Sequence, residues 1–371
     1  MPSRAYADEL IALGREAGLA SMGVAPAEPF TRARRVIEER KAAGLNGSMN
    51  FTYKNPARST DPHAALSGAR SIVVGAFGYG AATSSIMSSP EAGAAAAGTI
   101  ARYAQADHYR MLRDALEVVG RRLRTDGWKT RIFVDDNSLV DREAAYLAGI
   151  GWYGKNANLL LPGMGSWFVL GSIVTDAPLP PNDRRVDDGC GPCRRCLDRC
   201  PTGAIIAPGV IDARRCLSWI LQAPGVVPRE FRVAVGNRIY GCDDCQDVCP
   251  KNSGVERDHE TEAGSPGAYV ELLEMLAADD ETLLARFGRF YLWQREVRYL
   301  RRNALVALGN VGDGRDPAVA TTLTTWLRCS DPLVRAHAVW AAGQLNRLDL
   351  VPIADGEDAR EVRDEMNALG L

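Results

Sequence analysis

Apolar positions in the first half of the chain follow two patterns, continuous runs and helical spacing. Continuous apolar runs at 71–77 and 167–174 predict strands buried on both faces. A shorter apolar run at 131–134 predicts a strand that ends at two aspartates. Apolar residues recur at helical spacing over 7–18 and 107–124, which predicts amphipathic helices. We therefore expect an α/β (α+β) domain over residues 1–180.

The rest of the chain changes character twice. A tract rich in Gly, Ala and Ser at 78–99 predicts a mobile loop. A proline-rich polar segment then leads into a cysteine-rich stretch, which predicts a ferredoxin-like domain over residues 181–255. Residues 256–371 have helical periodicity, with Asp316 and Asp331 each preceding a proline at an expected helix start. We expect an all-α domain there.

The helical part contains a weak internal repeat. The segment at 301–309 resembles the segment at 335–343, at an offset of 34 residues. This spacing favours two helical hairpins of the HEAT type, which need another element to complete their core. A plain helical cap is the alternative.

Composition limits the number of domains and the kinds of partner, but it does not indicate a function. The chain has 371 residues, which suits two or three domains, and its formal net charge is −2. A polyanion site must therefore be a local patch. The N-terminal residues lack a long apolar signal core, and the longest uncharged apolar stretch, at 159–174, is interrupted by Pro162 and several glycines. We expect a cytoplasmic protein without a membrane partner.

Eight of the nine cysteines lie between positions 190 and 249. The first four have the spacing Cys-x2-Cys-x2-Cys-x3-Cys-Pro, the bacterial ferredoxin pattern in which the fourth cysteine ligates the other cluster. The last four repeat this pattern with a longer first gap. The pairing rule predicts two [4Fe–4S] clusters, one on a first cysteine set (Cys190, Cys193, Cys196 and Cys249) and one on a second cysteine set (Cys200, Cys216, Cys242 and Cys245).

Two other interpretations of the cysteines fit less well. Zinc sites use paired Cys-x2-Cys groups rather than this run, and a disulfide framework suits small secreted chains. The ninth cysteine, Cys329, stands alone in an apolar helical stretch and is expected to have no function.

Several longer segments carry a resemblance to a known family. They are Tyr103-Ala104, Asp107-His108-Tyr109, Val134-Asp135, the AGIGWYGKN segment at 148–156, CPTGA at 200–204 and GNRIYGCDDCQ at 236–246. With them the chain resembles the epoxyqueuosine reductases over nearly its whole length. Many ferredoxins share the first cysteine run, whereas the GWxGKN and NRIYGCDDCQ segments are more specific to this family.

The resemblance implies a reductase that uses cobalamin and two [4Fe–4S] clusters to convert epoxyqueuosine to queuosine in a tRNA anticodon loop. It places the catalytic acid on Asp135, whose alternative role is that of a turn or capping residue. It also implies an external electron donor, a monomer, and a C-terminal domain that holds the anticodon stem-loop. The cofactor-binding residues that it indicates are Arg58, Tyr103, Lys155, Asn156 and Ser218. From its turn alone, Lys155 could instead be a solvated loop residue.

The chain departs from the family pattern near the expected active site. After Asp135 the family usually has a small residue, Ala or Gly, and Pro, whereas this chain has Asp136, Asn137 and Ser138. Asp141 stands where the family usually has glutamate, and residues 221–223 differ as well. These departures bear on the substrate more than on the cofactors.

A basic segment at 285–302 interleaves arginines with aromatic residues. Such a segment can contact RNA phosphates while its aromatic rings pack or stack. The predicted RNA-binding residues are Arg295, Arg298, Arg301 and Arg302, and we expect charge reversal at Arg298 and Arg301 to weaken tRNA binding. The alternative is an amphipathic helix with a solvated basic face.

Three other functions remain open at this point. A cobalamin-dependent reductase of a small substrate such as an organohalide would not need a basic C-terminal domain. A ferredoxin-type electron carrier would leave most of the chain without a purpose, since a ferredoxin needs only about 60 to 80 residues. An interaction protein built on HEAT repeats would need no cobalamin.

Overall fold

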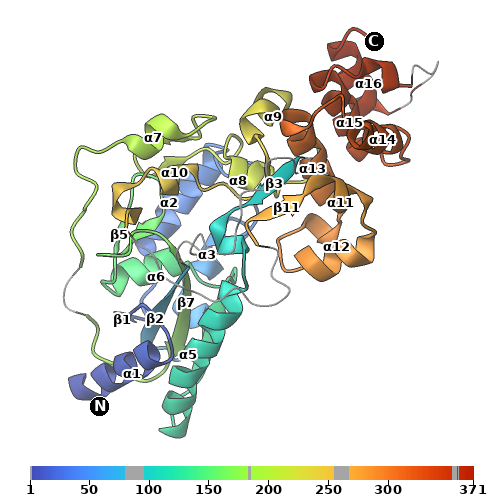
Figure 1. Cartoon of the computed structure of the whole chain (residues 1–371). Coiled ribbons are helices and arrows are strands. Elements are labelled where there is room, and N and C mark those ends of the chain that lie inside the picture. The colour runs from blue at the N-terminus through green and yellow to red at the C-terminus, as the bar shows by residue number, and fades with distance from the viewer. Residues whose placement is uncertain (1, 80–95, 183–184, 255–266, 353–356, 358) are drawn as a thin grey trace. The chain divides into compact units, whose positions relative to one another are not determined.

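The computed structural model describes residues 2–79, 96–182, 185–254, 267–352, 357 and 359–371. The chain forms two compact units, and it passes between them more than once (Figure 1). Unit 1 comprises Met1–Thr83, Asp107–Arg214 and Asp244–Glu260. Unit 2 comprises Ser84–Ala106, Arg215–Asp243 and Thr261–Leu371. The cysteine-rich segment contributes to both units, and the division into domains 1–180, 181–255 and 256–371 stays a prediction.

Unit 1 is built on a four-stranded antiparallel sheet. Its strands are β1 (Ser21–Pro26), β2 (Ser71–Gly78), β7 (Phe168–Thr175) and β4 (Thr130–Val134), in that spatial order. Both central strands, β2 and β7, are buried along their whole length. This confirms the fully buried strands predicted from the continuous apolar runs, because each face of the sheet is covered.

Alternate residues of β2 point to opposite faces of this sheet. Gly75 pairs with Gly171 of β7, and side chains at either position would collide with Leu116 of α5 (His108–Thr125), so this helix lies close over the two glycines. The same face receives α1 (Arg4–Glu16). On the other face, Ile72 and Val74 share a core with α6 (Asp141–Leu147). The helices predicted at 7–18 and 107–124 are therefore confirmed.

Shorter elements complete unit 1. A buried carboxylate, that of Glu143 in α6, accepts hydrogen bonds from Arg32 and from the Tyr153 hydroxyl, which ties three elements together. The shorter elements of unit 1 are α2 (Thr31–Ala42), α3 (Pro56–Ser59), α4 (Pro62–Ala65), β5 (Trp152–Tyr153), β6 (Leu159–Leu160), α7 (Arg195–Arg199), β8 (Ile205–Ala207), β9 (Val210–Ile211), α10 (Asp244–Asp247) and the 3-10 turn η2 (Pro250–Asn252).

Unit 2 contains a small sheet that the sequence did not predict. Its central strand β3 (Ala97–Ile100) runs parallel to β10 (Arg238–Tyr240) and antiparallel to β11 (Tyr269–Glu271). Residues 97–99 therefore correct the predicted loop at 78–99, of which 80–95 lie outside the described residues. The C-terminal region is likewise not purely helical, because β11 pairs with β3.

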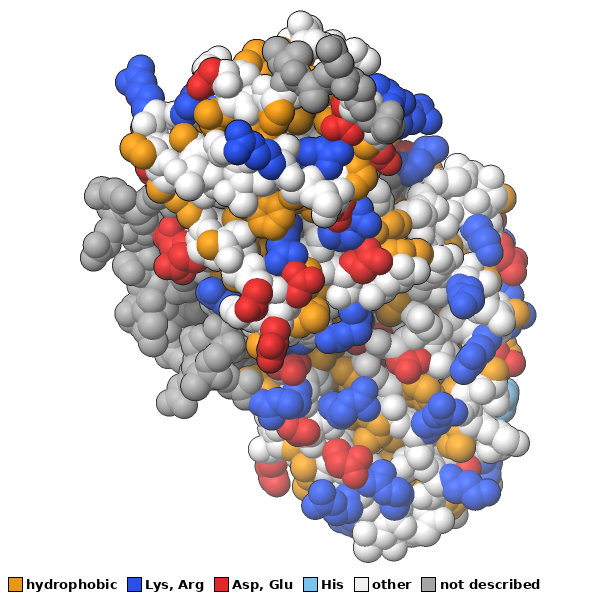
Figure 2. Space-filling view, turned by 90° about the vertical axis from the view of Figure 1, so that its right-hand side faces the viewer, with side chains coloured by type: hydrophobic (Ala, Val, Ile, Leu, Met, Phe, Trp, Pro, Cys, Tyr) orange, Lys and Arg blue, Asp and Glu red, His pale blue; other side chains and the backbone are white. Residues whose placement is uncertain are grey.

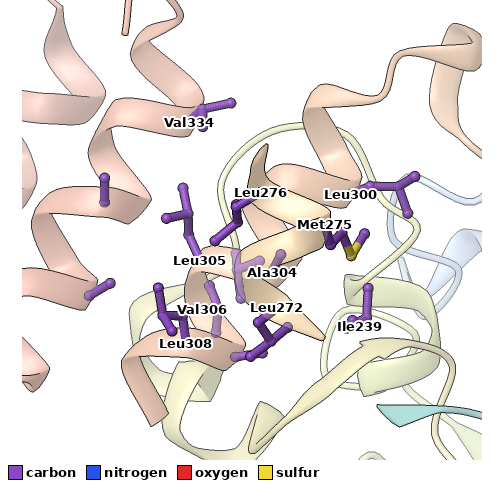
Figure 3. Close-up of a cluster of buried hydrophobic side chains, with 14 of the residues drawn as sticks. Ile239, Leu272, Met275, Leu276, Leu300, Ala304, Leu305, Val306, Leu308 and Val334 are labelled. Carbon is purple, nitrogen blue, oxygen red and sulfur yellow. The ribbon is translucent and has the colours of Figure 1, made fainter. Parts of the chain in front are cut away.

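The helices of unit 2 share one apolar core with this sheet. Figure 3 shows Leu300, Ala304 and Leu308 of α13 (Arg298–Val311) among core residues that include Ile239 of β10. The other helices and turns are η1 (Arg102–Ala104), α8 (Leu217–Ile220), α9 (Arg229–Val235), α11 (Leu272–Ala277), α12 (Asp280–Phe287), η3 (Trp293–Arg295), α14 (Pro317–Trp326), α15 (Pro332–Gln344), η4 (Leu348–Leu350) and α16 (Arg360–Ala368).

The two copies of the internal repeat lie on α13 and α15, which pack together. Gly309 permits this packing, since a side chain there would meet Trp340 and Ala341 of α15. Asp316 and Asp331 cap α14 and α15 by accepting hydrogen bonds from backbone N–H groups, as predicted. The pair rests on the core of unit 2, and its assignment to the HEAT type stays a prediction. None of the described helices is both long and apolar enough to cross a membrane.

Candidate iron–sulfur and catalytic sites

The first cysteine set lines a single pocket in unit 1. Cys190, Cys193, Cys196 and Cys249 all line this pocket, which is partly open to solvent. All four thiols are free and partly buried. Helix α7, which carries Cys196, packs against α10, just before Cys249 in the chain. The fold thus brings together the four cysteines that the pairing rule had grouped.

The electrostatics of this pocket suit the binding of iron ions by the four cysteines. Burial raises the pKa of both Cys196 and Cys249, and neighbouring thiols of the same set raise it further. Ionising four thiols side by side is unfavourable unless iron ions compensate the charge. A set of four cysteines around an empty space is therefore able to hold one [4Fe–4S] cluster.

Two predicted cofactor residues lie beside this pocket. The Lys155 ammonium donates to the Gly191 carbonyl at 2.6 Å and to the Cys193 carbonyl at 2.8 Å. The buried Asn156 amide donates to the Cys245 carbonyl at 3.4 Å. Their contacts support the cysteine loops, whereas the resemblance had indicated that they bind a cofactor.

The second cysteine set is divided between the units. Cys200 and Cys245 belong to unit 1, and Cys216 and Cys242 belong to unit 2. The Cys200 sulfur accepts a hydrogen bond from the Ala204 backbone N–H at 3.2 Å, a contact that also stabilises thiolates. The assembly of the four into a second cluster site stays a prediction.

Asp135 follows β4 directly and adopts a left-handed backbone with φ of 51°. Its neighbour Asp136 is turned toward the backbone, because its carboxylate accepts from the Ser138 N–H at 2.7 Å. Desolvation of the carboxyl group by surrounding protein atoms raises the pKa of Asp135, and the charge of Asp136 adds to the increase. The residue is nevertheless exposed to solvent, so it is open to a substrate.

Asp141 is a second carboxyl group at this place, and the sequence had marked it only as a departure from the family. It lies in the first turn of α6 and accepts a hydrogen bond from the Ser172 hydroxyl at 3.2 Å. Burial raises its pKa well above the usual range, and Asp135 and Asp136 contribute to the rise. Three carboxyl groups in mutual electrostatic contact favour retention of a proton near the end of β4.

The other predicted cofactor residues lie in different places. Arg58 is exposed in α3 of unit 1. In unit 2, the Gln222 amide donates to the Tyr103 hydroxyl at 3.4 Å and to the Ser218 carbonyl at 2.9 Å. Tyr103 and Ser218 are thus brought together, and their role toward cobalamin stays a prediction.

The predicted RNA-binding arginines differ in exposure. Arg302 is fully buried and donates to the carbonyls of Ile220, Leu221, Ala223 and Gly225. It therefore stabilises unit 2 from within and is not available to RNA, which corrects the prediction for this residue. Helical spacing alone did not reveal this, because the acceptors are some eighty positions away in the chain.

The remaining arginines lie nearer the surface. Arg301 is mostly buried and pairs with Asp280. Arg298 is about one-third exposed, at 35%, and pairs with Asp331 at 2.6 Å. Arg295 is exposed. The segment is also not one continuous helix, since α12 ends at Phe287 and α13 begins at Arg298.

Two family models match parts of this chain. A family model described as a 4Fe-4S double cluster binding domain matches residues 189–252, and one described as Epoxyqueuosine reductase QueG, DUF1730 matches residues 59–136. The fold and the cysteine pocket thus define an oxidoreductase with two [4Fe–4S] clusters.

Curated relatives identify the family. The epoxyqueuosine reductase of Bacillus anthracis is 32% identical over 91% of this chain and 88% of its own length. That of Escherichia coli is 34% identical over 81% of this chain and 79% of its own length. The chain belongs to the epoxyqueuosine reductase family.

Solved structures of this family share the whole fold. An epoxyqueuosine reductase crystallised with an epoxyqueuosine-modified tRNA-Tyr stem loop is 29% identical, with a TM-score of 0.86 over 99% of both chains. The Bacillus subtilis enzyme, with its catalytic aspartate loop swung out of the active site, is 28% identical, with a TM-score of 0.86 over 99% of this chain and 98% of the other.

Proposed function

We propose that this protein reduces epoxyqueuosine to queuosine in the anticodon loop of a tRNA. The observation that carries the proposal is its fold, which matches over 99% of the chain a reductase crystallised with an epoxyqueuosine-modified stem loop. The pocket formed by the first cysteine set supplies the redox part of this function.

Removing the epoxide oxygen to leave an alkene consumes two electrons and two protons and releases one water molecule. Iron–sulfur clusters supply the electrons one at a time. The protons must come from acids beside the opening ring, because negative charge builds on the leaving oxygen. We assign the first proton to Asp135, since a raised pKa keeps more of its carboxyl group protonated and the residue is exposed to solvent.

Cobalamin is part of the proposal through the family resemblance, and when bound it would supply the reducing centre at the epoxide. Arg58, Tyr103 and Ser218 are the candidate contacts. Arg58 belongs to unit 1 and the other two belong to unit 2, so each contact is a separate proposal. Lys155 and Asn156 are better explained by the cysteine loops to which they donate hydrogen bonds.

The proposed partners follow from the substrate. The tRNA stem-loop would contact the surface around Arg295 and Arg298, and an external carrier would deliver electrons to the clusters. We further propose that the protein works as a monomer in the cytoplasm.

The test is reconstitution of the purified protein without oxygen, using iron, sulfide and cobalamin, followed by reaction with tRNA that carries epoxyqueuosine. We expect roughly eight irons, in line with two cubane clusters, and one cobalt for each chain. With a chemical reductant, mass spectrometry of the digested tRNA should show a nucleoside that has lost one oxygen atom. A fully loaded protein that leaves this nucleoside unchanged would overturn the proposal.

A further inference from the structure

We propose that Lys155 is a positioning residue that sets the reduction potential of the cluster on the first cysteine set. It would do so in two ways, by holding the loop that carries three of the ligands and by keeping a positive charge beside the cluster. The inference rests on the presence of this cluster and is independent of the substrate.

Lys155 is attached to the ligand loop itself. Its ammonium group donates to the carbonyls of Gly191 and Cys193 at 2.6 and 2.8 Å, so it lies within the turn that connects the first two ligands. Lys155 also lines the pocket together with the four cysteines. Its side chain is partly buried, and a charge in such a place is screened less by salt than one in open water.

The charged residues lining this pocket have one sign. Besides Lys155 they are Arg195 and Lys251, both exposed, and no carboxylate is among the described lining residues. Two acids along the ligand loop lie outside the lining of the pocket. Asp188 accepts from the Cys190 N–H at 2.8 Å and Asp198 pairs with Arg194 at 3.0 Å. Lys155 differs from the other two cations because it is partly buried and hydrogen-bonded to the loop.

The physical consequence concerns the reduced state of the cluster. A cubane held by four thiolates is an anion, and it gains one further negative charge when it accepts an electron. A fixed cation nearby stabilises the reduced form more than the oxidised form, which raises the potential. Replacing Lys155 with a neutral residue should therefore make this cluster harder to reduce.

The experiment is a redox titration of the reconstituted protein followed by electron paramagnetic resonance, with iron content measured on the same samples. In Lys155→Met we expect one cluster to shift to a lower potential by about 59 mV, which corresponds to a tenfold change in the one-electron equilibrium. The other cluster should keep its potential. Repeating the titration in Cys216→Ala, which lacks a ligand of the second set, identifies the cluster that shifts.

Two variants separate the charge of Lys155 from its hydrogen bonds. Lys155→Arg keeps the charge and should keep the potential, whereas Lys155→Gln keeps an N–H donor and should lower the potential. Lys41→Met is the matched control, because Lys41 also donates to a carbonyl, that of Tyr53 at 2.9 Å, but does not line the pocket.

Either of two outcomes would overturn the proposal. One is full iron content with unchanged potentials in both neutral variants. The other is loss of the first cluster in both neutral variants and its retention in Lys155→Arg, which would make Lys155 a structural link alone. Since no tRNA is used, neither outcome bears on the proposed epoxyqueuosine reduction.

Discussion

At the residue scale, three carboxyl groups, those of Asp135, Asp136 and Asp141, influence one another electrostatically near the end of β4. Asp136 is held by a local turn, Asp141 accepts a hydrogen bond from the Ser172 hydroxyl, and Asp135 is exposed to solvent. The left-handed backbone at Asp135 is a conformation that aspartate tolerates better than most residues. Among the three, Asp135 is therefore the group that we propose meets a substrate.

The first prediction is that Asp135→Asn lowers turnover by about 10²- to 10⁴-fold, the usual contribution of a general acid. Iron content and tRNA binding should stay at the level of the original protein. Single-turnover measurements on epoxyqueuosine tRNA test this loss. Asp136→Asn is the control at acidic pH, since asparagine preserves the acceptor that Ser138 requires. A fully active Asp135→Asn protein would contradict the assignment.

The second prediction concerns pH. A proton donor must be protonated, so the rate should fall as pH rises through the Asp135 pKa, which burial and Asp136 place above the ordinary aspartate value. Removing the charge of Asp136 should lower the pKa of Asp135. The alkaline limb of the rate profile should therefore lie at lower pH in Asp136→Asn. An identical limb in both proteins would show that another group controls the rate.

At the element scale, packing between helices and loops decides which groups are reachable. The α13–α15 pair is buried against the core of unit 2, where Arg302 binds loop carbonyls and His337 joins α15 to the segment before α9. The His337 ring accepts from the Val227 N–H at 3.1 Å through Nε2, and its Nδ1 lies 2.7 Å from the Leu333 carbonyl. These contacts require the neutral ring with its proton on Nδ1.

The third prediction follows from the buried His337 ring. Burial lowers its pKa well below the usual value, and nearby Arg232 and Arg302 lower it further. Below about pH 6.5, His337 binds a proton in the unfolded chain but not in the folded chain. The free energy of unfolding therefore falls with decreasing pH by up to about 1.4 kcal/mol per pH unit.

Thermal unfolding of His337→Gln between pH 7.5 and 5.5 tests this origin. The variant should be less stable at neutral pH but should lose less stability on acidification than the original protein. His63→Gln, at an exposed position, should retain the original pH dependence. Equal acid sensitivity in all three proteins would assign the effect to other groups.

The fourth prediction tests the pairing of cysteines across α7 and η2. Cys249 lies in the same pocket as the three cysteines of the first run, so Cys249→Ala should lose about half of the iron, one cluster of two. Cys329→Ala is the control, because this thiol lies in unit 2, where its Sγ is 3.3 Å from the Asp331 carbonyl. Full iron content in Cys249→Ala would refute the crossed pairing.

At the scale of the whole molecule, the chain is nearly neutral, and its charges are mixed. Figure 2 shows basic and acidic side chains interspersed over one face of the molecule. A net charge of −2 offers no general attraction for RNA, so binding must rely on local groups. Of the predicted arginines, Arg295 is exposed, whereas Arg298 and Arg301 are paired with aspartates.

The fifth prediction is that Arg295→Gln weakens stem-loop binding and reduces the slope of log affinity against log salt by about one, as expected for loss of one phosphate contact. Charge reversal at Arg298, suggested by the sequence, would place a like charge beside Asp331 and destabilise α15 as well. Arg121→Gln, at an exposed position in unit 1, is the control. Unchanged binding of Arg295→Gln at low salt would remove this residue from the interface.

The sequence by itself determined what depends on spacing along the chain. The cysteine run predicts cluster chemistry because ligand spacing is short, and the continuous apolar runs predicted β2 and β7 because their pattern records burial on both faces. The aspartates before α14 and α15 likewise act on groups only two residues away. Longer motifs indicated the family, and the resemblance predicts that Asp135 is the acid.

Only the tertiary structure decided what depends on distant partners. The loop at 78–99 yields a strand at Ala97–Ile100 because β10 and β11, far away in the sequence, pair with it. In the sequence, Arg302 is indistinguishable from a surface arginine of a helix, but in the fold it is buried and donates to carbonyls of the loop at 220–225. Lys155 is likewise an ordinary loop lysine in the sequence, and only the fold shows that it donates to carbonyls of the cysteine turn. Local periodicity indicates which secondary structure a segment prefers. Burial and strand pairing depend on which remote segments the fold brings into contact.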